Sequence, residues 1–289
     1  MKFRVIEAEK AKVPIRRSCA LLDVSESGFY AWQTREPSQR QRDDMVLLAH
    51  VRSQFFTSRE TYGSPRMTVE LKEAGVAIGR HRVARLMREN GLKAFQKRRF
   101  KRTTDSAHGG LIAPNMLDQD FETTGPNEKW GVDISYIWTA EGWLYLAIVL
   151  DFFSRRIIGW AVSDRLKKDL ALSALERAIA IRRPPEDVIH HSDRGSQYCS
   201  DTYQNLLKRH GFIISMSGKG NCYDNAMVET VFRTIKSELV WRTIYKTRSQ
   251  AQTHIGTYID AFYNPRRRHS ALGYKSPIEF ENIALALVT

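Results

Sequence analysis

One stretch in the middle of the chain decides its fold: His190-His191-Ser192-Asp193-Arg194-Gly195-Ser196-Gln197-Tyr198. The apolar pair before it, Val188-Ile189, predicts a strand, and Asp193 falls where this strand runs out into a glycine-containing turn. A carboxylate at a strand end is held rigidly by the strand and left accessible by the turn. Asp193 is therefore the first candidate for a chemical role.

The segments on either side of this stretch predict further strands and helices. Strands are indicated by alternation and by β-branched and aromatic residues, and helices by apolar residues that recur every three or four positions. The first three strands are joined by short turns, which favours antiparallel pairing. The predicted strands are residues 130–138, 143–151, 156–162, 188–191 and 212–215, and the predicted helices are 167–181, 201–210 and a later one that Asp224 can cap. This order predicts an α/β, RNase H-like fold with a mixed five-stranded sheet flanked by helices.

In this order of elements, two more acids converge with Asp193. Asp133 lies in the middle of the first predicted strand, and Glu229 lies on the late helix beside an apolar stripe. Three carboxylates from separate elements can supply the hard oxygen ligands that two divalent cations need. Arg233 and Lys236 follow Glu229 at i+4 and i+7, so they lie along one helix edge and can meet DNA phosphates.

The spacing of these acids is similar to a known pattern. Asp193 and Glu229 are separated by 35 residues, as in the DD(35)E pattern of retroviral integrases and of IS3-family insertion-sequence transposases. The flanking sequences also resemble OrfB, the second-frame product of the IS3 family, and the likeness covers nearly the whole chain. The matching stretches are Gly125–Trp130, His191–Tyr198, Asp224–Glu229 and the positions Tyr263, Asn264, Arg267, His269, Leu272–Tyr274 and Ser276–Pro277.

The resemblance implies a DDE-type transposase, an enzyme that cleaves and transfers DNA strands at insertion-sequence ends. Asp133, Asp193 and Glu229 would be its catalytic residues and would hold two Mg²⁺ ions, for which Mn²⁺ can substitute. The implied partners are DNA, both as terminal inverted repeats and as target, further copies of the chain assembled on DNA, and OrfA as a fusion or a separate protein. The leucine-zipper heptads expected of OrfA do not occur in this sequence.

Basic residues are concentrated toward the N-terminus. The net charge is +13, and residues 1–117 contain 23 Lys and Arg against 12 Asp and Glu, whereas the rest of the chain contains 22 against 20. Two helix-turn-helix patterns lie in the basic part, one from Ile15 to Trp32 and one from Ser64, interpreted as an N-cap, to Gly91. Nucleic acid is the commonest partner of such a region. The residues expected to contact DNA here are Arg80, Arg82, Arg85, Arg88, Lys97, Arg98, Arg99, Lys101 and Arg102.

Composition and pattern divide the chain into five parts. The expected parts are a short helix-turn-helix-like segment (1–36), a second helix-turn-helix-like DNA-binding domain (37–96), a basic linker (97–117), the RNase H-like integrase catalytic core (118–241) and a C-terminal helical extension (242–289). In the last part, the basic cluster Arg266–His269 is either a DNA-binding turn or part of the packing of a terminal helix against the core.

Several alternatives remain open. A nuclease with the same core would cut DNA without joining it, and a DNA-binding regulator would not need Glu229. Asp151, near a strand end, is interpreted as structural, with an auxiliary catalytic role as the alternative. Ser192 beside two histidines is not expected to form a nucleophilic pair, because adjacent strand residues point to opposite faces. His191 and Gln197 are supporting groups at most.

Composition also argues against other classes of protein. No apolar run reaches the length of a membrane span, and the charged N-terminus does not match a secretory signal. The three cysteines are odd in number and far apart, which argues against a disulfide framework or a zinc site. A reducing, bacterial cytoplasmic location, in association with DNA, is expected.

Overall fold

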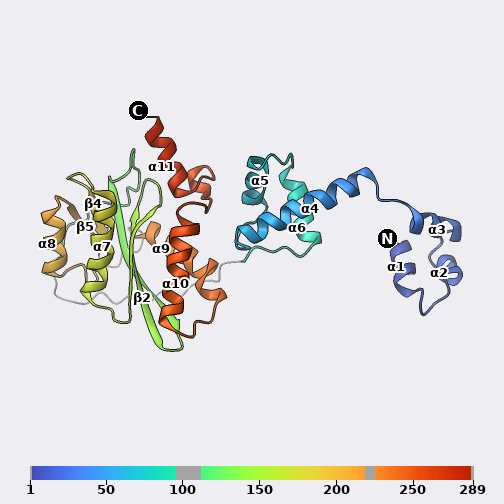
Figure 1. Ribbon diagram of the computed structural model, residues 1–289, viewed down its shortest axis with the longest axis horizontal. Coiled ribbons are helices and arrows are strands. Elements are labelled where there is room, and N and C mark those ends of the chain that lie inside the picture. The colour runs from blue at the N-terminus through green and yellow to red at the C-terminus, as the bar shows by residue number, and fades with distance from the viewer. Residues whose placement is uncertain (1, 96–111, 219–224, 288–289) are drawn as a thin grey trace.

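The computed structural model of the chain describes residues 2–95, 112–218 and 225–287. It consists of an N-terminal segment of three helices, a second helical module and a larger part built on a β-sheet (Figure 1). The N-terminal segment and the sheet lie at opposite ends of the long axis, with the helical module between them (Figure 1). The predicted combination of an all-α N-terminal region and an α/β core is confirmed.

The sheet has five strands in the order β3-β2-β1-β4-β5. β1 pairs antiparallel with β2 and parallel with β4, so the sheet is mixed, as the sequence predicts. β2 and β3 are antiparallel, whereas β4 and β5 are parallel. The strands are β1 (Lys129–Thr139), β2 (Gly142–Asp151), β3 (Ile157–Ser163), β4 (Ile189–Ser192) and β5 (Ile213–Met216).

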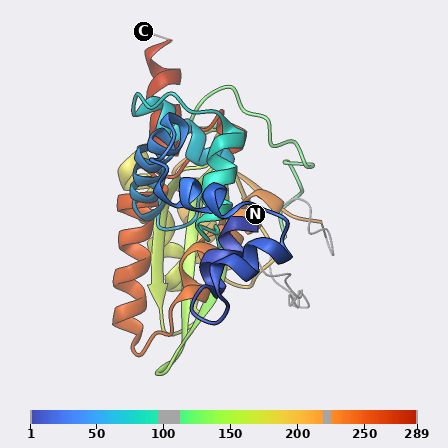
Figure 2. The ribbon, with the colours of Figure 1, turned by 90° about the vertical axis from the view of Figure 1, so that its right-hand side faces the viewer.

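Helices cover both faces of the sheet (Figures 1 and 2). One face carries α7 (Lys168–Arg182) and α8 (Asp201–Arg209), and the other carries α9 (Ala226–Glu238) and α10 (Arg248–Tyr258). β2 contributes to both sides, because Leu146, Ile148 and Leu150 belong to the α9 side whereas Ala147 and Val149 belong to the α7 side. Burial on two faces explains why this strand is apolar at nearly every position.

The chain beyond α10 continues to pack on the sheet-based part. A π-helical turn (Ile259–Tyr263) extends α10, and α11 (Pro277–Ala286) follows a short irregular stretch. The side-chain amide of Asn264 donates to the carbonyl of Ile157 on β3 at 2.9 Å, and the amide oxygen accepts the Ile157 N–H at 3.0 Å. On α11, the buried Glu281 pairs with Arg156 and Arg182. The C-terminal helices are therefore tied to β3 and α7.

The helical module contains α4 (Gln39–Thr57), α5 (Ser64–Glu73) and α6 (Arg80–Glu89). α5 and α6 form the second predicted helix-turn-helix pair. α4 has no counterpart in the sequence prediction, because its apolar residues do not form one stripe and Met45, Val46 and Phe56 are exposed. The prediction that Ser64 caps α5 is wrong by one residue, since the N-cap is Gly63 and Ser64 is already helical.

The N-terminal segment consists of α1 (Lys2–Glu9), α2 (Ile15–Leu21) and α3 (Glu26–Thr34). Its small core contains Ile6, Cys19 and Phe29, one residue from each helix. Cys19 and Phe29 come from the two halves of the predicted helix-turn-helix pattern, so the pattern marks residues that pack together. Among the described residues of the whole chain, no helix is both long and apolar enough to cross a membrane.

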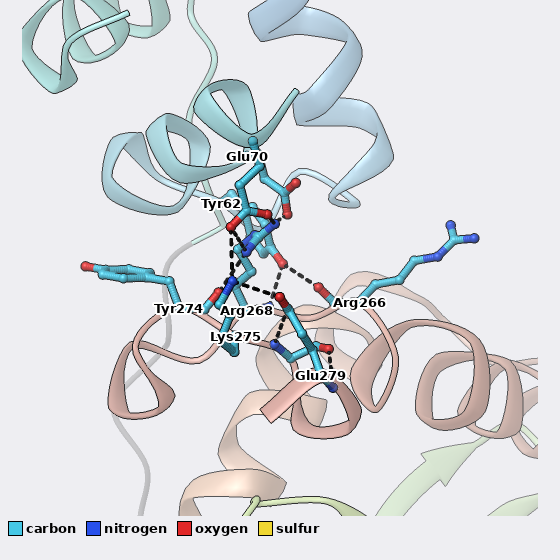
Figure 3. Close-up of polar contacts among 9 residues, drawn as sticks. Tyr62, Glu70, Arg266, Arg268, Tyr274, Lys275 and Glu279 are labelled. Atoms are coloured by element: carbon cyan, nitrogen blue, oxygen red, sulfur yellow. Dashed lines mark hydrogen bonds and ion pairs between the residues drawn. The ribbon is translucent and has the colours of Figure 1, made fainter. Parts of the chain in front are cut away.

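Arg268 fixes the helical module to the sheet-based part (Figure 3). Its guanidinium forms ion pairs with Glu70 and Glu73 of α5, with 2.6 Å between its Nε and the Oε1 of Glu70. Its backbone N–H donates to the Tyr62 hydroxyl at 2.7 Å, and this hydroxyl donates to the carbonyl of Arg266 at 3.3 Å. We call this set of contacts the Arg268 clamp.

Arg267 is engaged inside the core. It is 2% exposed, and its Nε and Nη2 donate to the two carboxylate oxygens of Glu238 at 2.8 and 2.6 Å. The hydroxyl of Tyr258 donates to the same carboxylate at 2.7 Å. The sequence allows the basic cluster to be interpreted either as a DNA-binding turn or as part of the packing against the core, and Arg267 and Arg268 are engaged in packing contacts. The Arg266 side chain is exposed and points away from the clamp (Figure 3).

The substitution Arg268→Ala should lower the free energy of unfolding by about 1–3 kcal/mol, because it leaves the partly buried Glu70 without its cation and Glu73 with Lys275 alone. Arg266→Ala is the matched control, since it removes the same kind of side chain from an exposed position two residues away and leaves the backbone carbonyl that accepts from Tyr62. Urea denaturation of the two variants measures the difference. Equal stability of Arg268→Ala and Arg266→Ala would show that the clamp adds nothing to the fold.

Candidate catalytic site

The pairing of β1 with β4 sets Asp133 beside Asp193. Gly131 lies opposite His191 in this parallel pair. Asp133 and Asp193 are each two residues further along, so they lie at the same level of the sheet. β4 ends one residue before Asp193, whereas β1 continues for six residues past Asp133. The parallel pairing therefore brings Asp193, predicted at a strand end, next to Asp133, predicted in the middle of a strand.

Asp193 is oriented by its own turn. Its Oδ1 accepts the backbone N–H of Gly195 at 2.8 Å. A Cβ atom on Gly195 would lie 2.9 Å from the same oxygen, so a side chain there would disturb the carboxylate. Arg194 anchors the turn to the end of β5, since its Nε donates to the carbonyl of Ser217 at 2.7 Å. The turn therefore fixes the direction of the Asp193 carboxylate.

Glu229 approaches the same region because α9 packs closely on β1. At Gly131, a Cβ atom would come within 2.7 Å of the Val228 side chain and within 2.3 Å of Phe152. Only a residue without a side chain permits this contact. Glu229 follows Val228 in the first turn of α9 and is exposed. The helix and its glutamate are thus held against the strand that carries Asp133.

The start of α9 is also tied to β1 directly. The N-cap residue, Asn225, is buried, and its side-chain amide donates to the carbonyl of Val132 at 3.4 Å. This bond joins the helix to the residue before Asp133. Asp224, the predicted cap, lies outside the described residues. Sequence reasoning missed Asn225 and Gly131, although a glycine inside a strand is a known sign of close approach by another element.

The charges of Asp193 and Glu229 both act on Asp133, so the three acids lie in one region. Burial raises the pKa of Asp133 well above its usual value, and the charges of Asp193 and Glu229 raise it further. The Ile134 N–H, which donates to Asp133 Oδ1 at 2.7 Å, and the ammonium of Lys236 act in the opposite direction but do not cancel the effect. The site therefore carries an excess of negative charge that a cation would neutralise.

The carboxylates suit a divalent metal ion by their chemistry. Mg²⁺ and Mn²⁺ prefer hard oxygen donors, and Asp133, Asp193 and Glu229 are such donors from three separate elements. In the part of the chain that the structure describes, however, no group of three His, Cys, Asp or Glu side chains already has the geometry to hold one ion. The three acids therefore lie close enough for their charges to interact. To bind one ion together, their carboxylate oxygens would have to move closer to one another.

Lys236 lies beside Asp133 and not on an outer helix face. Only 8% of it is exposed, and its Nζ lies 4.9 Å from the centroid of the Tyr136 ring. Burial lowers the pKa of Lys236, and the nearby charge of Asp133 opposes this shift. Arg233, one turn earlier on α9, is exposed. The two predicted phosphate-binding cations therefore occupy different positions, one at the carboxylates and one on the surface.

The two histidines of the central stretch are buried and held by polar contacts. The Nε2 atom of His190 lies 3.0 Å from the Tyr203 hydroxyl, and burial lowers the pKa of His190 to about 3. His191 contacts the hydroxyls of Ser215 and Ser217 at 2.8 and 3.0 Å. These contacts leave neither ring directed at Ser192, as expected from the alternation of the strand.

Asp151 is also structural. It is fully buried and accepts the backbone N–H groups of Asn127 and Phe153, both at 2.9 Å, and Arg182 lies 3.7 Å away. Burial raises the pKa of Asp151 to about 6 despite these contacts. It lies opposite Trp130 on β2, three residues along the sheet from the level of Asp133. The interpretation of Asp151 as a structural acid agrees with this position.

The predicted DNA-binding arginines of α6 divide into two groups. Arg82 and Arg85 are held by Asp44 of α4, with N···O distances of 2.8 and 2.6 Å. These two arginines lower the pKa of Asp44. Arg80 and Arg88 are exposed. The remaining predicted contacts, Lys97, Arg98, Arg99, Lys101 and Arg102, lie outside the described residues.

Comparison with known proteins identifies the family. Residues 123–222 and 210–277 match descriptions of an integrase core domain, and residues 41–100 match that of an HTH-like domain. The transposase InsF for insertion sequence IS3A from Escherichia coli strain K12 is 43% identical over 293 residues, which cover 99% of this chain and 100% of InsF. The chain belongs to the IS3 family of insertion-sequence transposases. The transposase is accordingly of the DDE type, a polynucleotidyl transferase of DNA transposition, as the sequence resemblance implies.

The chain is also similar to another insertion-element protein and, at low identity, to two viral structures. An uncharacterized 31 kDa protein of insertion element IS600 from Shigella sonnei is 44% identical to this transposase over 262 residues, which is 91% of this chain and 96% of that protein. A simian T-cell lymphotropic virus intasome in complex with PP2A regulatory subunit B56 gamma shares 15% identity, with a TM-score of 0.46 over 80% of this chain and 74% of that one. The HTLV-2 integrase catalytic core domain in complex with magnesium shares 16%, with a TM-score of 0.41 over 54% and 97%.

The substitution Gly131→Ala should separate α9 from β1. The added methyl group meets Phe152 and Val228, so we expect the free energy of unfolding to fall by about 1–3 kcal/mol and DNA cleavage to fall with it, because Glu229 moves away from the aspartates. Gly125→Ala is the control, since its Cβ atom would lie 3.5 Å from Glu128, an ordinary contact. Unfolding and cleavage assays of both variants test this. Wild-type cleavage by Gly131→Ala would contradict the role of this contact.

The substitution Asp133→Asn should stabilise the transposase in metal-free buffer. An acid whose pKa is raised by folding lowers stability as the pH rises from its ordinary pKa to the raised one, so the advantage of the variant should grow over this range and then stay constant. With the terminal-repeat duplex present, Mg²⁺ should raise the unfolding temperature of the wild type but not that of the variant. Calorimetry with EDTA and with Mg²⁺ measures both effects. An Asp133→Asn protein that is less stable in EDTA at pH 8, or that gains as much from Mg²⁺, would rule out this account.

Proposed function

We propose that this transposase cleaves DNA strands at the ends of its insertion sequence and joins them to target DNA, with Asp133, Asp193 and Glu229 as ligands of two Mg²⁺ ions. The observation that carries the proposal is the convergence of three carboxylates from β1, the end of β4 and the first turn of α9. Their shared electrostatics support it, since the raised pKa of Asp133 reflects charge that divalent ions would neutralise. Mn²⁺ would fit the same donors.

The proposed reaction consists of two displacements at phosphorus. In cleavage, water attacks a phosphodiester, one P–O bond forms and another breaks, and a 3′-hydroxyl leaves. In joining, this 3′-hydroxyl attacks a target phosphodiester in the same way. Bound metal ions would supply Lewis acidity for the attacking and the leaving oxygen.

The protein groups orient the reacting strand. β1 and the Asp193 turn hold two of the acids rigidly, and the Lys236 ammonium beside Asp133 would balance the charge of the entering phosphate. α9 brings the third acid through its contact at Gly131. DNA phosphate oxygens and water would complete the coordination, so we expect the three acids to close around the ions only when a DNA end is bound.

The proposed DNA-binding surface extends from the catalytic site to the helical module. Arg233, Arg80 and Arg88 are exposed and would meet phosphates directly. Arg82 and Arg85 now pair with Asp44 and would bind DNA by releasing this carboxylate. A phosphate can accept the same guanidinium hydrogen bonds as the carboxylate does. The predicted run 97–102 would follow the DNA backbone between the two parts.

The proposed division of labour follows the sequence-based parts. The helical module (37–96), with the short segment (1–36), would bind the terminal inverted repeats, and the core (118–241) would carry out the chemistry on them and on target DNA. The C-terminal extension (242–289) would support the core through Arg267 and the Arg268 clamp. Assembly of further copies on DNA, a contribution from OrfA and action in the bacterial cytoplasm belong to the same proposal.

The direct test is cleavage and joining of a DNA duplex that carries the element's terminal repeat, with Mg²⁺ and a target plasmid. The substitution Asp193→Asn should reduce both activities by at least about 100-fold, equivalent to about 3 kcal/mol of transition-state stabilisation. Asp201→Asn is the matched control, because it makes the same change at an exposed acid of the same core. EDTA should abolish activity, and Mg²⁺ or Mn²⁺ should restore it.

Three outcomes would contradict the proposal. Full activity of a folded Asp193→Asn protein would remove the carboxylates from the mechanism. Cleavage without joining under all conditions would identify a hydrolytic nuclease. Specific DNA binding without any cleavage, unchanged when Glu229 is replaced by glutamine, would identify a DNA-binding regulator.

A further inference from the structure

A pocket of about 450 Å³ opens beside Lys236, between the β1–β2 hairpin and the short helix η1 (Val240–Arg242) that follows α9. It is rich in aromatic side chains, and the function proposed above does not use it. We call it the aromatic pocket. Its described lining residues are Tyr136, Ile137, Trp138, Ala140, Trp143, Lys236, Val240, Trp241, Thr243, Ile244 and Tyr245.

Three of the aromatic side chains are unusually exposed. Trp138 is 59% exposed, Trp143 44% and Tyr136 39%. Trp138 and Trp143 are directly opposite in the β1–β2 pair, and their rings meet edge to face at 4.8 Å between centroids. Tyr136 meets Trp143 in the same way at 5.3 Å. The three rings thus brace each other while large parts of their surfaces face solvent.

The exposure follows from the topology of the sheet. β4 pairs only with Lys129–Gly131 of β1, and further along an isolated bridge joins Thr139 to Tyr245. Among the described residues, no strand pairs with the part of β1 between these two points on that side. Along this part, Ile137 and Thr139 are buried whereas Tyr136 and Trp138 are exposed. Large aromatic residues on an uncovered strand are unfavourable in water, so packing alone gives no reason for them here.

Lys236 connects the aromatic pocket to the catalytic site. Tyr136 and Trp138 are three and five residues beyond Asp133 on the same strand, which corresponds to about 10 and 17 Å at about 3.3 Å per residue, and these odd offsets give their side chains the other face of the strand from Asp133. Lys236 belongs to both places, because its Nζ lies 4.9 Å from the Tyr136 ring centroid and its charge acts on Asp133. A strand held at the acids would therefore pass these rings about three to five nucleotides away, at about 3.4 Å per nucleotide.

The charge of the lining fits a nucleic-acid strand. Among the described residues that line the pocket, Lys236 is charged and none is acidic. Flat aromatic surfaces beside a cation are the arrangement that binds unpaired bases, since every base has a face that can stack and every nucleotide carries a phosphate. Base faces inside a duplex are already stacked, so such a pocket would select bases that have left the duplex.

We propose that the aromatic pocket binds unpaired nucleobases of the DNA strand whose phosphate enters the catalytic site. This inference rests on the proposed strand-transfer function and adds the requirement that base pairs near the element's end open before cleavage. Stacking on Trp138 and Trp143 offsets the cost of opening base pairs near the element's end. An opened end gives the three carboxylates access to the phosphate that a closed duplex would hold away from them.

The substitution Trp138→Ala tests this proposal on two DNA substrates. With a fully paired terminal duplex, cleavage should fall by about 10-fold or more, the loss expected for one base–aromatic stack. With the same duplex carrying mismatches three to five nucleotides from the cleavage point, most of the loss should disappear, because opening costs little there. Trp138→Phe keeps a stacking face and should stay within about threefold of the wild type. Ile181→Ala, which removes a comparably exposed apolar side chain of the core on α7, should have no effect.

Photocrosslinking gives a readout that does not depend on catalysis. In the full-length Asp193→Asn protein, 5-iodouracil placed three to five nucleotides from the cleavage point should crosslink to Trp138 or Trp143, and peptide mapping by mass spectrometry would locate it. Crosslinks only to residues outside the aromatic pocket would overturn the proposal. An equal loss of cleavage by Trp138→Ala on paired and mismatched DNA would also overturn it. A Trp138→Ala protein that changes its association state without DNA would assign the pocket to a second copy of the chain instead.

These measurements separate the two proposals. If wild-type protein neither cleaves nor joins DNA with Mg²⁺, the proposed function fails, whatever the crosslinks show. If wild-type protein cleaves and joins DNA, and Trp138→Ala does so equally well on paired ends, the catalytic proposal stands and the base-binding proposal fails.

Discussion

Repulsion among carboxylates gathered at the end of β4 is the interaction on which the site depends. Asp133, Asp193 and Glu229 come from three elements, and burial of Asp133 beside the other two charges raises its pKa. Such an arrangement weakens the fold unless a cation joins it, and the proposed binding of divalent ions would supply a physical reason for keeping it. Lys236 offsets part of the charge from within the protein, which leaves the site anionic and still able to receive divalent ions.

The rest of the core holds this unfavourable cluster in place. Gly131 lets α9 approach β1, and Asn225 fastens the start of that helix to the strand. At the other end of α9, Glu238 is fixed by Arg267 and Tyr258. The helix that carries Glu229 is therefore anchored at both ends, so its glutamate cannot drift away from the aspartates without breaking buried contacts. Because α9 is held rigidly, the three acids can stay close together although they repel each other, and they could then bind the same two metal ions.

The strands and the helix that carry the three acids could be predicted from the sequence, because their patterns are local. The alternation around Asp133, the strand that ends at Asp193 and the apolar stripe beside Glu229 report on their own elements, and the order of elements then fixes how the sheet is built. Contacts between distant residues leave no such periodicity. Arg85 and Asp44, or Arg268 and Glu73, pair only because helices pack against one another. Sequence reasoning therefore treated these arginines as candidates for DNA contact, and it missed α4, whose exposed apolar residues obscure its pattern.

The aromatic pocket was beyond prediction for a related reason. Tyr136 and Trp138 fit a strand pattern equally well whether a neighbouring strand covers them or not, and only the short pairing of β4 leaves them uncovered. Their position on the same strand as Asp133 joins the proposed base-binding surface to the proposed metal site. The fold would in this way link opening of a DNA end to the chemistry performed on it.

The central claim is that Asp133, Asp193 and Glu229 together hold two divalent ions when DNA is bound. A crystal structure of the protein with its terminal-repeat duplex and Mn²⁺, recorded at the manganese absorption edge, tests this claim directly. The account predicts two anomalous peaks within coordination distance of Asp133, Asp193 and Glu229. Peaks elsewhere on the protein, or bound DNA with no manganese among these acids, would contradict it.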